Sequence, residues 1–382
     1  MKKFIIATIL ICFATTAAAF DMESVQIHGF LSQGYLKSDN NDALFAKTSS
    51  SGTFEFNEFG LNIASQVNDN LRVGMQLLSR DMGDIGNNEV EIDWAYGDYN
   101  YRNWLGLRAG KMKTPYGLYN QSRDIDAART CILLPSSVYS EGFRESVSTT
   151  IGIGVYGELP GDIGYQLAYG TTQLKNDGGV AKLLTGLMGI PEFTGSSVDW
   201  AYAGDLKWST PIEGLTLGTS TLGYKAILSS NTPMPLDLEF EAESYIGSVE
   251  FIYGDLTLAS EYQLLTLDYS ISAFNINDEQ EIEGYYFLAS YRINDWFEVG
   301  TYYNVQYLDK DDKDGDRYKK VGQPAAKAWK KDLALTTRFD VNDNMVLKLE
   351  GHLMDGLATV EYDAADPDDT WYMLAAKVTF SF

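Results

Sequence analysis

Hydrophobic and polar residues alternate along most of the chain after residue 24. In the segment 297–307, for example, Phe297, Val299 and Tyr303 alternate with Glu298 and Asn304. A period of two places successive side chains on opposite faces of a β-strand, so one face suits lipid and the other suits water. We expect sixteen such strands, at approximately 24–36, 53–67, 71–80, 89–99, 104–112, 147–157, 163–170, 198–209, 215–225, 241–253, 256–267, 283–293, 296–307, 331–339, 345–354 and 370–382.

The connections between these segments alternate between short and long. Most short connections contain Asn, Asp, Gly or Pro, which supply the backbone geometry of tight turns. They lie at 68–70, 100–103, 160–162, 211–214, 254–255, 294–295 and 340–344, and the long ones lie at 37–52, 81–88, 113–146, 171–197, 226–240, 268–282, 308–330 and 355–369. Outer-membrane barrels have short periplasmic turns and long external loops, and an even strand number places both termini in the periplasm.

The pattern predicts an all-β fold, namely a transmembrane antiparallel β-barrel of sixteen strands formed by one domain, residues 20–382. A soluble β-sandwich or solenoid is the alternative, but neither fold requires long and short connections to alternate. After the N-terminal segment, the chain has no run of about 18 apolar residues that would predict a membrane-spanning helix. A barrel needs no such run, because its strands alternate between lipid-facing and lumen-facing residues.

The N-terminus has the pattern of a secretory signal. Two lysines precede an apolar run that ends near residue 14, and three alanines at 17–19 form a small-residue cleavage site. We therefore expect residues 1–19 to be removed and the mature chain to begin at Phe20. A lipoprotein signal at Cys12 is the alternative, but Ile11 stands where a small residue is required. The predicted location is the Gram-negative outer membrane, reached through the periplasm.

The charge of the mature chain excludes some partners. Removal of two signal lysines from the 29 basic residues leaves 27 against 53 acidic ones, a net charge of −26. So acidic a chain is not expected to bind nucleic acid, because that binding relies on basic contacts with phosphates. Cys131 is the single mature cysteine, so no internal disulfide is expected.

The mature chain resembles the Gram-negative porin superfamily over its whole length, and the sixteen-stranded type most. The resemblance rests on the first strand, which contains Val25 to Phe30, on an aromatic last strand that ends in Phe382, and on a longest connection after the fifth strand. It implies that this third loop folds into the lumen and narrows the pore. It also implies that the barrel-assembly machinery reads Phe382, and that the protein is a homotrimer.

The candidate functional site is a pore constriction. Charges of both signs recur at inward positions, where a dry core would not hold them but a water-filled lumen would. We expect the constriction to contain residues of the third loop and of the strand that leads into it, namely Lys111, Lys113, Arg123, Asp124, Asp126 and Arg129. The expected pore wall contains Arg72, Arg80 and Arg108, and Asp124 and Asp126 could face these arginines across the lumen. The alternative is that these loop charges are only solvated. Cys131 either reacts from the pore or packs against the wall.

The predicted function is passive diffusion of ions and small hydrophilic solutes. A substrate-specific channel for phosphate or other anions, sugars or small organic acids is the alternative. A basic ladder would favour anions and an aromatic track would favour sugars, but inward Tyr286 and Tyr302 do not decide between them. The acidic composition favours cations. A structural barrel or adhesin would need a plugged lumen.

An enzyme is not expected. The chain has only two histidines, His28 and His352, and it lacks the motifs of serine hydrolases, zinc proteases and phosphate-binding loops. No cofactor is expected. The acidic run 309–316 departs from a calcium-binding loop, because lysine stands at its first ligand position, so no specific metal site is expected. Outer-membrane lipid and lipopolysaccharide are the remaining expected partners.

Overall fold

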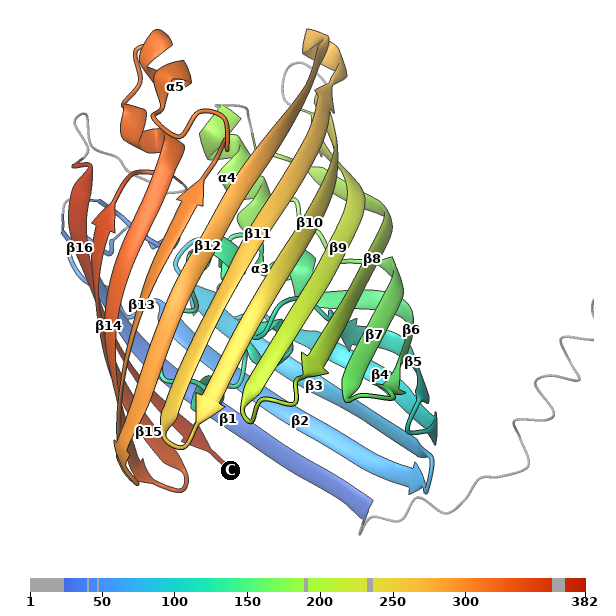
Figure 1. The fold of residues 1–382 in the computed structure, drawn as a ribbon. Coiled ribbons are helices and arrows are strands. Elements are labelled where there is room, and N and C mark those ends of the chain that lie inside the picture. The colour runs from blue at the N-terminus through green and yellow to red at the C-terminus, as the bar shows by residue number, and fades with distance from the viewer. Residues whose placement is uncertain (1–23, 40, 47, 189–191, 232–235, 359–367) are drawn as a thin grey trace, which may run out of the picture.

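The computed structural model is a closed antiparallel β-barrel (Figure 1). The structure describes residues 24–382 except 40, 47, 189–191, 232–235 and 359–367, so the predicted signal, 1–19, lies outside the described residues. The predicted sixteen-stranded barrel is confirmed. The strands are β1 Val25–Ser38, β2 Phe56–Asn68, β3 Leu71–Met82, β4 Val90–Arg102, β5 Leu105–Lys113, β6 Thr149–Leu159, β7 Ile163–Thr171, β8 Gly195–Ser209, β9 Leu215–Ser230, β10 Leu236–Tyr253, β11 Leu256–Ile271, β12 Ile276–Asn294, β13 Phe297–Tyr307, β14 Trp329–Asn342, β15 Met345–Asp355 and β16 Thr370–Ser381.

The first and last strands close the barrel. β1 pairs with β16 in a register that places Phe30 opposite Ser381. The terminal residue continues this pairing, because the backbone groups of Gly29 and Phe382 exchange two hydrogen bonds of 3.0 Å. The Phe382 ring covers Gly29, where an added Cβ would lie only 2.4 Å from the ring. A glycine therefore lets the aromatic terminus complete the seam.

Short turns and long loops lie at opposite ends of the barrel, with the loops uppermost in Figure 1. The long loops contain short helices that the period-two pattern does not reveal: α2 Ser136–Tyr139, α3 Arg144–Val147, α4 Gly179–Met188 and α5 Asp316–Lys320. Among the described residues, no helix is long and apolar enough to cross a membrane.

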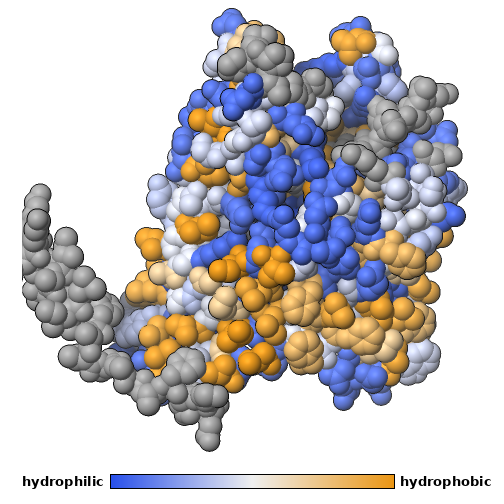
Figure 2. Space-filling view, turned by 180° about the vertical axis from the view of Figure 1, so that it is seen from behind, coloured by the Kyte–Doolittle hydropathy of each residue, from blue (hydrophilic) through white to orange (hydrophobic). Residues whose placement is uncertain are grey.

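The outer surface is hydrophobic over a broad band. Figure 2 shows this band around the lower half of one face, with hydrophilic surface above it. Tyr169, Tyr245 and Tyr372 are more than half exposed on the outer faces of their strands, whereas inward Gln76 and Asp205 are almost fully covered. The alternation therefore has the direction expected in a membrane, apolar outside and polar inside.

The strands on one side of the barrel are longer than predicted. β10 begins at Leu236 rather than at 241, and β12 begins at Ile276 rather than at 283. In the added part of β10, Leu238 and Phe240 are buried, whereas Glu239 is only partly covered and lies on the other face. Above the hydrophobic band the apolar side chains thus face inward and the polar ones outward, the reverse of the membrane-spanning part. The predicted strand began only near the point where the apolar side chains face outward.

This arrangement makes a topological prediction. An epitope inserted at Asp314, in the loop after β13, should bind antibody on intact cells, because long loops face outward. The same epitope at Asp295, in the short turn between β12 and β13, should bind only after the outer membrane is permeabilised. Antibody labelling of intact cells in the opposite sense would refute the orientation.

Candidate functional site

The connection between β5 and β6, residues 114–148, crosses the interior of the barrel. The Gly117 N–H donates to Ser220 of β9, the Leu118 N–H donates to Glu261 of β11, and the Leu133 N–H donates to Glu350 of β15. On the other side, Arg144 bonds to Glu58 of β2 at 2.6 Å. A segment bonded to inward side chains of such widely separated strands lies within the lumen. We call residues 114–148 the inner loop.

Glu261 holds the first part of the inner loop. Its carboxylate accepts hydrogen bonds from the Leu118 N–H at 2.9 Å, from Tyr286 at 2.8 Å and from Tyr139. Gly117 has a φ of +61°, and an added Cβ would meet the Tyr139 hydroxyl at 2.3 Å. This turn therefore needs glycine both for its backbone conformation and for its close approach to the carboxylate.

Asp126 holds the middle of the inner loop against β15 and β16. Its carboxylate lies 3.1 Å from Lys348 Nζ and 3.5 Å from Lys377 Nζ, and it accepts a 2.8 Å hydrogen bond from Thr379. Burial alone would raise the pKa of Asp126, but the attraction of Lys377, Lys348 and Arg129 holds that pKa well below its ordinary value. The aspartate is therefore ionised and bound to the wall.

Glu141 holds the last part of the inner loop. It pairs with Arg80 of β3 at 3.1 Å, and with Arg123 at 2.8 Å and Arg144 at 3.4 Å within the inner loop. Burial would raise the pKa of Glu141, but the three arginines lower it to about 2. Arg144 continues the network to Glu58. Removing one member of such a buried pair leaves an uncompensated charge.

The more accessible charged groups beside the inner loop belong to β5 and β8. On that side, Arg108 pairs with Asp98 at 2.9 Å and its guanidinium lies 4.1 Å above the Tyr156 ring. The Arg108 side chain is 25% exposed and that of Lys207 is 34% exposed, whereas those of Lys348 and Lys377 are 0% and 2% exposed. Solvent therefore reaches the lumen more readily at β5–β8 than at β15–β16.

The structure gathers most of the sequence-predicted site residues at the inner loop. Asp124 bonds to Lys113 at 3.1 Å and to Gln76 at 2.5 Å, and Arg129 donates to the Arg123 carbonyl at 2.7 Å. The expected facing of Asp126 toward wall arginines differs from the structure, which places Asp126 on the lysines of β15 and β16. Asp124 likewise faces Lys113 rather than Arg72, Arg80 or Arg108.

Two predicted residues lie apart from the inner loop and from the side chains that bind it. Lys111 shares its strand face with the exposed, outward Ile151, and its ammonium bonds to the Ile92 carbonyl and to Gln173. Arg72 is inward but exposed, in the second position of β3 after a short turn. Sequence reasoning missed Glu58 and did not assign the inward residues Glu261, Lys348 and Lys377 to the site, because alternation gives the face of a residue but not its partner.

Cys131 belongs to the packed part of the inner loop. It is 2% exposed, and burial raises the pKa of its thiol to about 12. Of the two alternatives left by the sequence, the structure supports packing against the wall. The native thiol should therefore react slowly at neutral pH.

The fold is that of the outer-membrane porins. No protein-family model matches the chain, and no curated protein matches its sequence. Solved structures do match, and they include the outer-membrane protein OmpT of Vibrio cholerae, with a TM-score of 0.61 and 10% identity over 94% of this chain and 97% of that one. The outer membrane channel DcaP of Acinetobacter baumannii matches with a TM-score of 0.60 and 12% identity, covering 94% and 97%. An anion-selective porin from Comamonas acidovorans gives 0.57 and 12%, covering 94% and 99%.

The buried ion pairs predict a pH dependence of stability. The pKa of Glu141 is lowered to about 2, so its contribution is complete above the unfolded-state value of about 4.3 and is lost as the pH falls toward 2. That difference corresponds to about 3 kcal/mol. The temperature at which the heat-induced gel shift occurs should fall over this range, and by less in Glu141→Gln. Glu213→Gln, in an exposed turn, is the control. Equal pH profiles for all three proteins would contradict the prediction.

Proposed function

We propose that the protein is an outer-membrane porin through which ions and small hydrophilic solutes diffuse passively. The observation that carries this proposal is the partly exposed group around Arg108 and Lys207, which remains beside the inner loop inside a barrel with an apolar exterior. Charged groups that are neither buried nor lipid-facing fit the wall of a hydrated passage. The solved porins and channels of the same fold support this function.

The passage runs between the inner loop and β5–β8. Gln121 borders the passage at the point where the inner loop touches the wall: it bonds to Gln166 of β7 at 2.9 Å, and both residues are only partly buried. Arg108 and Lys113 then belong to the constriction. The buried pairs that hold the inner loop in place are formed by other predicted residues, namely Arg80, Arg123, Asp124, Asp126 and Arg129. Arg72 lines the lumen beyond it, and Lys111 supports the outer wall.

The conduction test uses a cysteine introduced at Gln121. Purified protein should form open channels in planar bilayers, and a charged thiol reagent should lower the conductance of Gln121→Cys by narrowing the passage. Native Cys131 should leave the unsubstituted channel insensitive. Ser137→Cys, at a loop position that is 1% exposed, is the matched control. Absence of channels from folded protein would overturn the porin function. A reagent effect on Ser137→Cys but not on Gln121→Cys would overturn the route.

A substrate-specific channel remains the second candidate, because Arg108 stacks on Tyr156 and lies 5.6 Å from the Tyr96 ring. Such a group of one cation and two rings could retain a particular anion or sugar. Block of the current by low concentrations of one solute class would favour this candidate over general diffusion.

An enzymatic role is not part of the proposal. His352 Nδ1 lies 3.0 Å from Asp332, and Nε2 lies 3.1 Å from Glu350, so carboxylates occupy both ring nitrogens. Neither nitrogen is left to activate a nucleophile. The described residues contain no cluster of His, Cys, Asp and Glu suited to a metal ion.

We also propose export by a signal at 1–19, assembly of residues 20–382 as one barrel through recognition of Phe382, and contact with lipopolysaccharide at the external loops. The structural role of Phe382 supports the second step. Its carbonyl and N–H both pair with Gly29, so a signal at the C-terminus and closure of the barrel involve the same residue.

A homotrimer is the proposed assembly. Val73, Met75 and Leu77 form the apolar outward row of β3, but Ser79 and Asp81 follow directly on the same face. On the face opposite to that of Figure 1, hydrophilic surface descends to about mid-height (Figure 2). Neighbouring copies would cover this sector and keep it from lipid. A trimer form is described for the similar Vibrio cholerae OmpT.

A pair of matched substitutions tests the trimer. Ser79 of β3 and Ser260 of β11 are outward, partly buried serines on opposite sides of the barrel. Ser79→Trp should clash with a packed neighbour and yield monomers, whereas Ser260→Trp should place the indole in lipid and leave the trimer intact. Mass measurement in mild detergent distinguishes these states. A monomeric unsubstituted protein would refute the assembly.

A further inference from the structure

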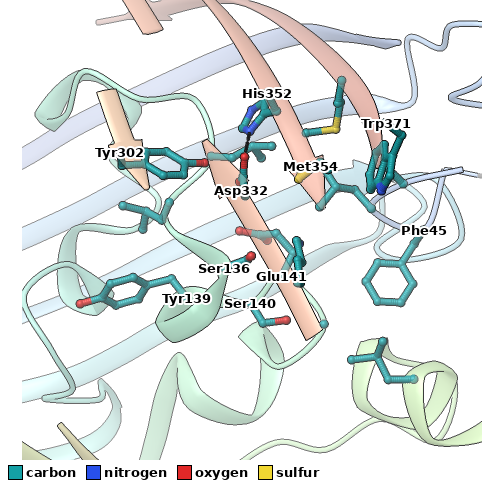
Figure 3. A pocket seen from close by; sticks show the side chains of 18 residues that line it. Phe45, Ser136, Tyr139, Ser140, Glu141, Tyr302, Asp332, His352, Met354 and Trp371 are labelled. Atoms are coloured by element: carbon teal, nitrogen blue, oxygen red, sulfur yellow. Dashed lines mark hydrogen bonds and ion pairs between the residues drawn. The ribbon is translucent and has the colours of Figure 1, made fainter. Parts of the chain in front are cut away.

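A small cavity lies between the inner loop and the inner faces of β13 to β16. Its volume is about 50 Å³. Figure 3 shows Ser136 and Tyr139 of the inner loop on one side, with Tyr302, Asp332 and His352 on the strands opposite. Apolar side chains form much of the remaining lining, including Phe45, Leu133, Leu183, Met354, Trp371 and Met373.

Lys330 is the unusual member of this lining. It lies on the inward face of β14 and is only 8% exposed. Among the residues that the structure describes, none forms a hydrogen bond or ion pair with its ammonium. Its ammonium has three donors to satisfy, and leaving them without acceptors beside an apolar lining is unfavourable.

The carboxylates of the lining already have other partners. Asp332 accepts hydrogen bonds from Asn304 at 3.1 Å and lies 3.0 Å from His352, and Glu141 pairs with three arginines. Since both ring nitrogens of His352 face carboxylates, both must donate, and the ring is therefore a cation. The Asp332 carboxylate is thus paired with the His352 cation, and Lys330 has no direct acceptor among the described residues.

We propose that this cavity binds a small aliphatic monocarboxylate, with the carboxylate on Lys330 and the alkyl part against Phe45, Met354 and Trp371. One water-sized position requires roughly 10–15 Å³, so the cavity holds about three to five such positions, close to the size of acetate or propionate. The apolar part of the lining, which includes Phe45, Met354 and Trp371, suits an alkyl group better than it suits water. The lining by Phe45 and Leu183 places the site toward the long-loop end of the barrel.

The site does not depend on conduction, so it can be tested apart from the proposed function. Saturation-transfer NMR on the purified, folded full-length protein in detergent would compare propionate with propionamide, which has nearly the same shape but no charge. We expect propionate to bind at least tenfold more tightly than propionamide. Absence of propionate binding, or equal binding of the amide, would overturn the proposal. Either result could occur in a fully conducting channel.

Two adjacent lysines supply a matched pair of variants. Lys330→Met should weaken propionate binding at least tenfold. Lys331→Met removes the same charge from the opposite face of β14, where Lys331 pairs with Asp355 at 3.1 Å, and it should leave binding unchanged. Unchanged binding in Lys330→Met would overturn the assignment of Lys330. If that variant does not fold, the comparison of propionate with propionamide on the unsubstituted protein still decides the proposal.

Discussion

The need to pair every backbone polar group within the lipid layer is the constraint on which the rest of this structure depends. A sheet meets that need only if it closes, because an open edge would expose unpaired N–H and C=O groups to hydrocarbon. Here the closure involves the last residue of the chain, with Phe382 bonded to Gly29. Closure in turn forces one face of every strand toward a shared interior, and that interior has to hold the polar half of each alternating pattern.

The inner loop changes the environment of the polar side chains that face the interior of the barrel. In an empty lumen, water would solvate the inward charges, but the inner loop covers several of them and must supply partners instead. Glu58, Asp126 and Glu141 each bind two or more cations, so the charges form a continuous network from β3 through the inner loop to β15. Because breaking one such buried pair costs about 3–5 kcal/mol, the inner loop behaves as a fixed part of the barrel rather than as a mobile lid.

The sequence predicted the barrel well because period two and connection length are local signals. It predicted which side chains face inward, including Lys348 and Glu350, for the same reason. It did not predict their partners, since Glu58 and Arg144 are 86 positions apart and their meeting depends on the path of the inner loop. Lys111 was assigned to the pore, although its register with Ile151 places it on the outer face. The short helices were missed because they lie in loops that have no strand period.

The reversed pattern of β10 shows how one strand can lie partly in lipid and partly in water. Near its short-turn end, Val249 and Phe251 face outward and Ser248 is buried inside, as a membrane requires. Toward the loop end, Leu238 and Phe240 are the inward residues, and they join the same apolar cluster as Val180 and Leu184 of α4. The alternating geometry is continuous through both parts, and only the identity of the inner and outer side chains changes. Above the membrane, water lies outside and folded loop lies inside, so the energetically favoured pattern is that of a soluble protein core. The same strand can therefore extend past the lipid, and its inner face can anchor α4, which lies in the loop between β7 and β8.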